Sequence, residues 1–93
     1  MAWDGARAFV RAAGSPHSDA FAARLLSRLG PQLYGDFADT RQALLTALVE
    51  TGGDRHAADT EAGKWRVRLE DLLRTRPELT RAVLELTADG AEL

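Results

Sequence analysis

Apolar residues recur at intervals of three and four along the whole chain, and no segment alternates apolar with polar residues. The first spacing places side chains on one face of an α-helix, whereas alternation is typical of a strand. Glycine and proline interrupt this pattern at residues 14–16, 30–31, 52–53 and 77. The sequence therefore predicts an all-α fold, a compact bundle of four to five antiparallel helices with short connections.

These boundaries predict five helical segments within one domain that spans residues 1–93. The segments are 1–14, 15–30, 31–53, 55–76 and 77–88, followed by a frayed tail at 89–93. Ser15 and Pro16 are expected to begin the second helix. A continuous third helix would place Arg41 on an apolar face, so a break or kink near 35–39, with Asp39 as a cap, is preferred to an unbroken helix.

The apolar stripes of these segments predict one shared core. Ninety-three residues are enough for such a core without disulfides. The expected core residues are Trp3, Phe21, Leu25, Leu29, Leu44, Leu48, Trp65, Leu69, Leu72, Leu79, Val83 and Leu86.

Charge and composition exclude several classes of function. The net charge is −2, and the seven basic residues between Arg55 and Arg81 are interleaved with five acids, so nucleic acid is disfavoured as a partner. Cysteine is absent, which excludes disulfides and thiolate ligands. No apolar run is long enough for a membrane span, and Asp4 and Arg7 interrupt any signal core. We expect a soluble, cytoplasmic protein with no membrane contact.

Catalytic and ligand-binding patterns are not found in the sequence. His17 and His56 lack the spacing of metal ligands on a helix, and Gly52 with Gly53 is interpreted as a helix terminator. Most acids of the second half have an arginine or lysine three or four positions away, which is typical of surface ion pairs. The sequence predicts no enzyme, no cofactor, no metal site and no evident small-molecule ligand.

Five residues near the last two helices are the candidate partner surface: Val67, Leu84, Arg74, Arg81 and Arg76. The two aliphatic residues lie off the apolar stripes of their helices. If the last two helices pack as an antiparallel pair, both share one outer surface beside Arg74 and Arg81.

The helix start at Pro77 raises a separate question, because Arg76 precedes it where an aspartate or serine cap is usual. Two interpretations stay open. Either Thr75 caps one residue early, or the helix start is left to water or to the carboxylate of a partner.

The favoured function is a protein-protein interaction module, an adaptor or oligomerisation domain that binds a protein partner or a second copy by helix-face recognition. One alternative is a DNA-binding helix-turn-helix at residues 24–45, although its second helix would carry Arg41 as its one basic residue. A further alternative is a small ligand carrier or an enzyme without a recognisable motif, which would need an apolar cavity with a convergent polar group.

Three helix-boundary motifs carry a resemblance: "AWDGARAFVRAAG" at 2–14, "TGGD" at 51–54 and "RPEL" at 76–79. With them the chain resembles short actinobacterial alanine- and arginine-rich all-helical proteins and modules of unknown function. It departs from that pattern at Arg76, which replaces an aspartate, and by an added helix at 15–29. The resemblance implies an all-helical module associated with a larger effector or signalling protein, and it carries over no catalytic residue.

Overall fold

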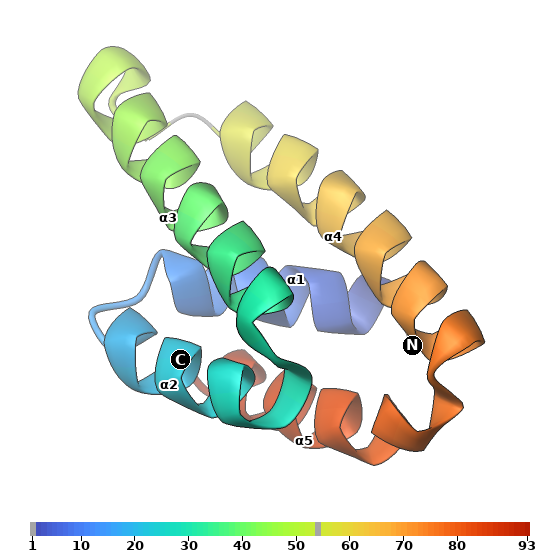
Figure 1. Cartoon of the computed structure of the whole chain (residues 1–93). Helices are drawn as coiled ribbons and strands as arrows, with labels where there is room; N and C mark the ends of the chain where they lie inside the picture. The colour runs from blue at the N-terminus through green and yellow to red at the C-terminus, as the bar shows by residue number, and fades with distance from the viewer. Residues whose placement is uncertain (1, 54) are drawn as a thin grey trace.

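The computed structural model describes residues 2–53 and 55–93, which form five α-helices, one 3₁₀ turn and no strand. Figure 1 shows their arrangement. The elements are α1 (Ala2–Ala13), α2 (Ser18–Leu29), α3 (Pro31–Thr51), α4 (Arg55–Thr75), η1 (Pro77–Leu79) and α5 (Thr80–Ala91). The predicted all-α bundle is confirmed. Within the described residues, no helix combines the length and the apolar character that crossing a membrane requires.

Helix α1 is the centre of the bundle, because it packs against α3, α4 and α5. Its buried residues are mostly small: Gly5, Ala6, Ala8, Phe9, Val10, Ala12 and Ala13. Two glycines permit close helix contacts. A Cβ at Gly90 of α5 would lie 2.6 Å from the backbone oxygen of Ala8, and one at Gly5 would lie 2.9 Å from a methyl group of Leu69 in α4. Small residues therefore set the spacing between α1 and the helices on either side.

One aromatic ring from each of α1, α2, α3 and α4 meets in a single cluster, formed by Phe9, Phe21, Phe37 and Trp65. The centroid of Phe9 lies 5.3 Å from that of Phe21 and 5.1 Å from that of Trp65, in edge-to-face geometry. The buried indole Nε1 of Trp65 donates a hydrogen bond of 2.7 Å to the hydroxyl oxygen of Thr40. Edge-to-face rings and a satisfied indole make this cluster a specific junction of four helices.

Two predicted core residues lie at the surface instead. Trp3 is 47% exposed, and Leu48 is 56% exposed. The guanidinium carbons of Arg7 and Arg66 lie 5.5 Å and 5.1 Å from the centroid of the Trp3 ring. Leu44, Leu72 and Leu79 are half-buried, and the other predicted core residues are buried. Phe9 and Phe37 fill the centre of the core instead. Trp3 lies in the first turn of α1, beside Arg66 of α4.

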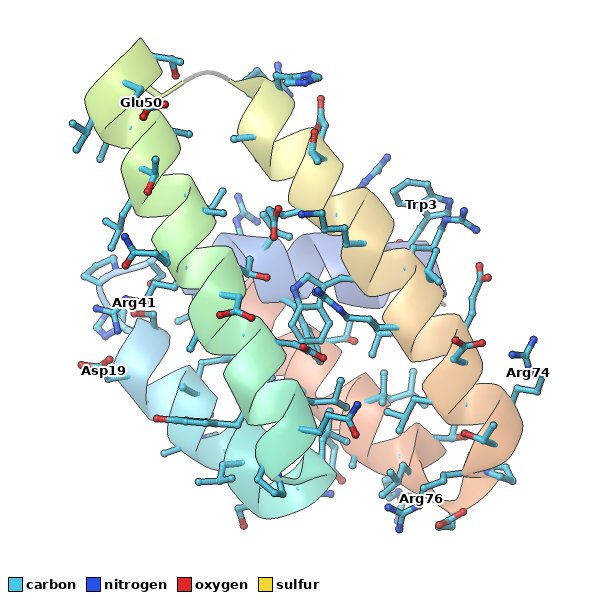
Figure 2. The ribbon with its side chains drawn as sticks, turned by 45° about the horizontal axis from the view of Figure 1, so that its top comes forward. Trp3, Asp19, Arg41, Glu50, Arg74 and Arg76 are labelled. Atoms are coloured by element: carbon cyan, nitrogen blue, oxygen red, sulfur yellow. The ribbon has the colours of Figure 1, made fainter. Side chains whose placement is uncertain are left out.

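The expected break in the third helix is wrong, because α3 runs unbroken through residues 35–39. Asp39 is therefore no cap. Arg41 avoids burial without a break in the helix, because Thr40 is the residue that faces the core and Arg41 is exposed. Its guanidinium forms an ion pair of 2.5 Å with Asp19 of α2, and Figure 2 shows the two side chains together.

The ends of two other helices also differ from expectation. Helix α2 begins at Ser18 rather than Ser15, because the Ser15 hydroxyl oxygen accepts the backbone N–H of His17 within a turn. Helix α5 continues to Ala91, so residues 89–91 are no frayed tail. Asp89 pairs with Arg24 of α2 at 3.1 Å, and Gly90 is buried against α1.

The close contact at Gly90 gives a first prediction. Gly90→Ala forces a methyl group against the backbone of Ala8, so we expect it to lower the free energy of unfolding by about 1–3 kcal/mol. The matched control is Gly35→Ala in α3, where an added Cβ meets nothing within 4 Å and should stabilise by about 0.5–1 kcal/mol. Denaturant titration measures both, and equal effects would contradict the close packing.

The hydrogen bond inside the aromatic cluster gives a second prediction. Thr40→Val leaves the buried Trp65 N–H without its acceptor, and we expect a loss of about 1–3 kcal/mol of stability. Thr46→Val, on an exposed turn of the same helix, should change stability by less than about 0.5 kcal/mol. Thermal unfolding followed by circular dichroism compares the two, and a neutral Thr40→Val would show that the bond contributes nothing.

Candidate functional site

The distal halves of α3 and α4 extend past the core. In α3 no residue from 41 to 51 is buried, and in α4 none from 55 to 60 is buried. Figure 1 shows these ends reaching beyond α1. The exposed part of α3 is nevertheless apolar, since Leu45 is 48%, Leu48 56% and Val49 86% exposed. A soluble monomer seldom leaves such side chains together without a use.

A groove of about 1200 Å³ lies between these distal halves and α1. Most of its apolar lining comes from three helices: Val10 and Ala13 of α1, Leu44, Leu45, Ala47 and Leu48 of α3, and Ala57, Ala58 and Ala62 of α4. Leucines form one wall and alanines most of another, so the lining is smooth and wide enough for bulky aliphatic side chains. Grooves of this kind, built on rigid helices, are typical binding sites for an amphipathic helix.

The charged residues that line the groove are mostly basic. They are Arg7 and Arg11 of α1, Arg41 of α3 and Arg55 of α4, and the one acid among the described lining residues is Asp59. Arg11 donates a hydrogen bond of 3.2 Å to the backbone oxygen of Ala91. Basic side chains therefore outnumber acidic ones among the described lining residues, although the whole chain has a net charge of −2.

Another face of the same two helices has the opposite character. A shallower hollow of about 560 Å³ there is lined by Asp39 and Glu50 of α3 and by His56 and Ala57 of α4. Figure 2 places Glu50 near the far end of α3. The α3–α4 pair thus presents a basic apolar groove on one face and carboxylates on another.

The helix packing on which the expected partner surface depended differs from the prediction. Val67 and Leu84 are about half exposed, at 50% and 49%. Their helices do not form the expected antiparallel pair, because α1 packs between α4 and α5 and Gly5 contacts both. The shared outer surface stays a prediction without the helix pair that suggested it. Arg74 pairs with Asp71 of its own helix, and Arg81 is exposed.

At the corner between α4 and η1, Arg76 and Thr75 both make hydrogen bonds within the chain. Thr75 is no early cap, since its hydroxyl donates back to the carbonyl of Asp71 at 2.8 Å. Arg76 instead donates from Nε to the Glu78 carboxylate at 3.0 Å. The pKa of Glu78 is lowered first by a hydrogen bond from its own backbone N–H and then by Arg76. Glu78 supplies the carboxylate that the missing aspartate would have supplied, and Figure 2 shows Arg76 at this corner.

The geometry offers little to the helix-turn-helix alternative. Gly30 alone separates α2 from α3, whereas that motif uses a turn of about three or four residues. Helix α3 carries Arg41 as its one basic residue, against Asp36, Asp39 and Glu50. Phosphates would meet a net negative helix there.

In the part of the chain that the structure describes, two buried guanidinium nitrogens lack a hydrogen-bond partner, Arg66 Nε and Arg68 Nη1. Each guanidinium lies on an indole ring, Arg66 on Trp3 at 5.1 Å and Arg68 on Trp65 at 5.0 Å. Stacking accounts for their position. Among the described residues there is no group of three or more side chains suited to hold a metal ion.

Sequence reasoning missed the groove because it assigned Leu44 and Leu48 to the core. A usable signal was present in residues 43–49, "ALLTALV", which are apolar on more sides of the helix than one core can cover. The arginines gave no signal, since they stand far apart in the sequence.

Comparison of the chain with protein-family models, with curated proteins and with solved structures gave no significant match. The resemblance to actinobacterial helical modules stays a prediction.

The corner supplies a prediction about pH. We expect the Glu78 carboxyl to titrate below 4.5, and Arg76→Gln to move its pKa part of the way back, because the backbone N–H remains. A lowered folded-state pKa stabilises the fold above the unfolded-state pKa, and that contribution is lost as the pH falls through the folded-state value. An NMR titration of the side-chain carboxyl carbon measures the shift. Arg74→Gln is the control, and an equal shift there would contradict a specific Arg76 effect.

Proposed function

We propose that this chain is a protein-interaction module that holds an apolar helical segment of a partner protein in the groove between α1, α3 and α4. The observation that carries the proposal is the uncovered apolar half of α3. Residues 41–51 include Leu44, Leu45, Leu48 and Val49, and none of them is buried.

The energetics support an occupant for this groove. A leucine moved from water into a packed interface contributes about 1.5–3 kcal/mol, and three leucines lie along one wall. A helical segment of about ten residues is marginal by itself in water, so the distal half of α3 depends on the rest of its helix. A docked helix would bury the leucines and add contacts where the fold alone has few.

The groove is formed mainly by three helices, with a smaller contribution from residues 14–16 and Gly53 of the connections, which favours recognition with little rearrangement. Thr40 fixes α3 to α4 at the base of the groove through the bond to Trp65. A preformed site avoids part of the ordering cost that a flexible one would have. An adaptor or oligomerisation role, with a link to a larger effector or signalling protein, belongs to this proposal.

The test uses a designed helical peptide of about 18 residues, about 27 Å long, with leucines along one face and glutamines elsewhere. We expect it to shift the amide NMR signals of groove residues, with a Kd of about 1 mM or tighter. Leu48→Gln should weaken binding about tenfold by removing an apolar wall residue. Val67→Gln is the matched control, an equally exposed aliphatic residue outside the groove.

Two results would overturn the proposal. One is that the peptide shifts no groove signal at millimolar concentration. The other is that Leu48→Gln and Val67→Gln change binding equally, which would mean that the peptide adheres to exposed aliphatic side chains wherever they lie.

A further inference from the structure

We infer that the partner helix is acidic: apolar on the face that enters the groove and lined with carboxylates along its flanks. This inference rests on the proposed function and names the chemistry of the partner. It is carried by the arginines that line the groove, because their positions bring positive charge to both the α1 side and the α3–α4 side of the apolar lining.

The arginines come from three helices that are distant in the sequence. Arg7 and Arg11 are one turn apart on α1, so both lie along the same edge. Arg41 stands on α3, and Arg55 begins α4. A helix lying among them would have basic side chains near both of its flanks, and Asp59 is the one carboxylate among the described lining residues.

Three of these four guanidinium groups are open to a new carboxylate. Within residues 2–53 and 55–93, Arg7, Arg11 and Arg55 form no ion pair. Arg11 uses one of its five N–H donors on Ala91, which leaves the others for a partner. Arg41 is paired with Asp19, whose side chain is 87% exposed, so that pair is weakly held by its surroundings.

A second copy of the chain fits this groove less well. A symmetric dimer brings the same face of two molecules together, so the four arginines of one copy would meet the four of the other. The α3 wall of the groove could offer no acid in return, since Glu50 lines the other hollow. Opposed like charges disfavour that assembly and favour a partner of opposite charge.

Nucleic acid also fits less well. Between the arginines the groove presents leucine and alanine side chains, whereas a phosphate backbone seeks a polar, densely basic surface. An amphipathic helix satisfies both parts of the lining, with its leucines on the apolar wall and its carboxylates on the arginines.

The experiment compares three peptides with the same leucine face and with glutamine, glutamate or lysine at the flanking positions. We expect the glutamate peptide to bind the full chain about tenfold more tightly than the glutamine peptide, and the lysine peptide to bind more weakly than either. Raising the salt from about 50 mM to about 500 mM should remove most of the difference. Fluorescence anisotropy of labelled peptides measures all three.

Arginine variants connect the charge preference to the groove. Arg7→Gln with Arg55→Gln should weaken the glutamate peptide several-fold and leave the glutamine peptide unchanged. Arg74→Gln with Arg81→Gln is the matched control, since both arginines are exposed and neither lines the groove. Circular dichroism of each variant shows that the fold is retained.

The outcomes separate the two proposals. Equal binding of the glutamate and lysine peptides overturns the acidic partner and leaves the groove function standing, whereas no binding of any peptide overturns both. A solution mass of two chains, with Leu48→Gln returning it to one, assigns the groove to a second copy and overturns the inference. Duplex DNA that displaces the bound glutamate peptide overturns it as well.

Discussion

The hydrogen bond from Trp65 to Thr40 joins the two longest helices inside the aromatic cluster, and the rest of the arrangement depends on that junction. On one side of it, α3 and α4 bury Phe37 and Leu69 against the shorter helices. On the other side α4 buries only Glu61 and Ala62, and no residue from 41 to 51 of α3 is buried. The hydrogen bond between the Trp65 indole and the buried Thr40 hydroxyl fixes the register of α3 against α4. A shift of one helix by one residue would leave the indole N–H unpaired in the core.

The groove follows from a mismatch in helix length. Helix α1 has 12 residues and is about 18 Å long, whereas α3 and α4 have 21 residues each and are about 31 Å long. The small residues of α1 bring α4 and α5 close to it, so the core is tight but short. The surplus length of α3 and α4 must lie outside that core. A long apolar helix beside a short central one thus leaves an exposed apolar groove.

Sequence patterns were sufficient for the helix count and for most of the core, because glycine and proline mark the boundaries and apolar spacing marks the faces. They failed where two apolar stripes share one helix. In α3, Leu33, Phe37 and Thr40 lie on one stripe, while Tyr34, Leu45 and Leu48 lie on the neighbouring stripe about 100° away. Periodicity cannot decide which stripe faces inward. The aromatic contacts of Phe37 decide it, and they are tertiary.

The charge of the groove could not be predicted from the sequence for a related reason. Net charge averages over the whole surface. The basic segment at residues 55–81 includes arginines that the fold pairs with nearby acids, such as Arg74 with Asp71 and Arg76 with Glu78. The arginines that line the groove stand at 7, 11, 41 and 55, and only the packing of α3 and α4 against α1 gathers them. A partner would therefore sense a local positive field on a chain of net negative charge. Because that field weakens within about 10 Å at moderate salt, it would act on a helix already near the groove rather than on distant charges.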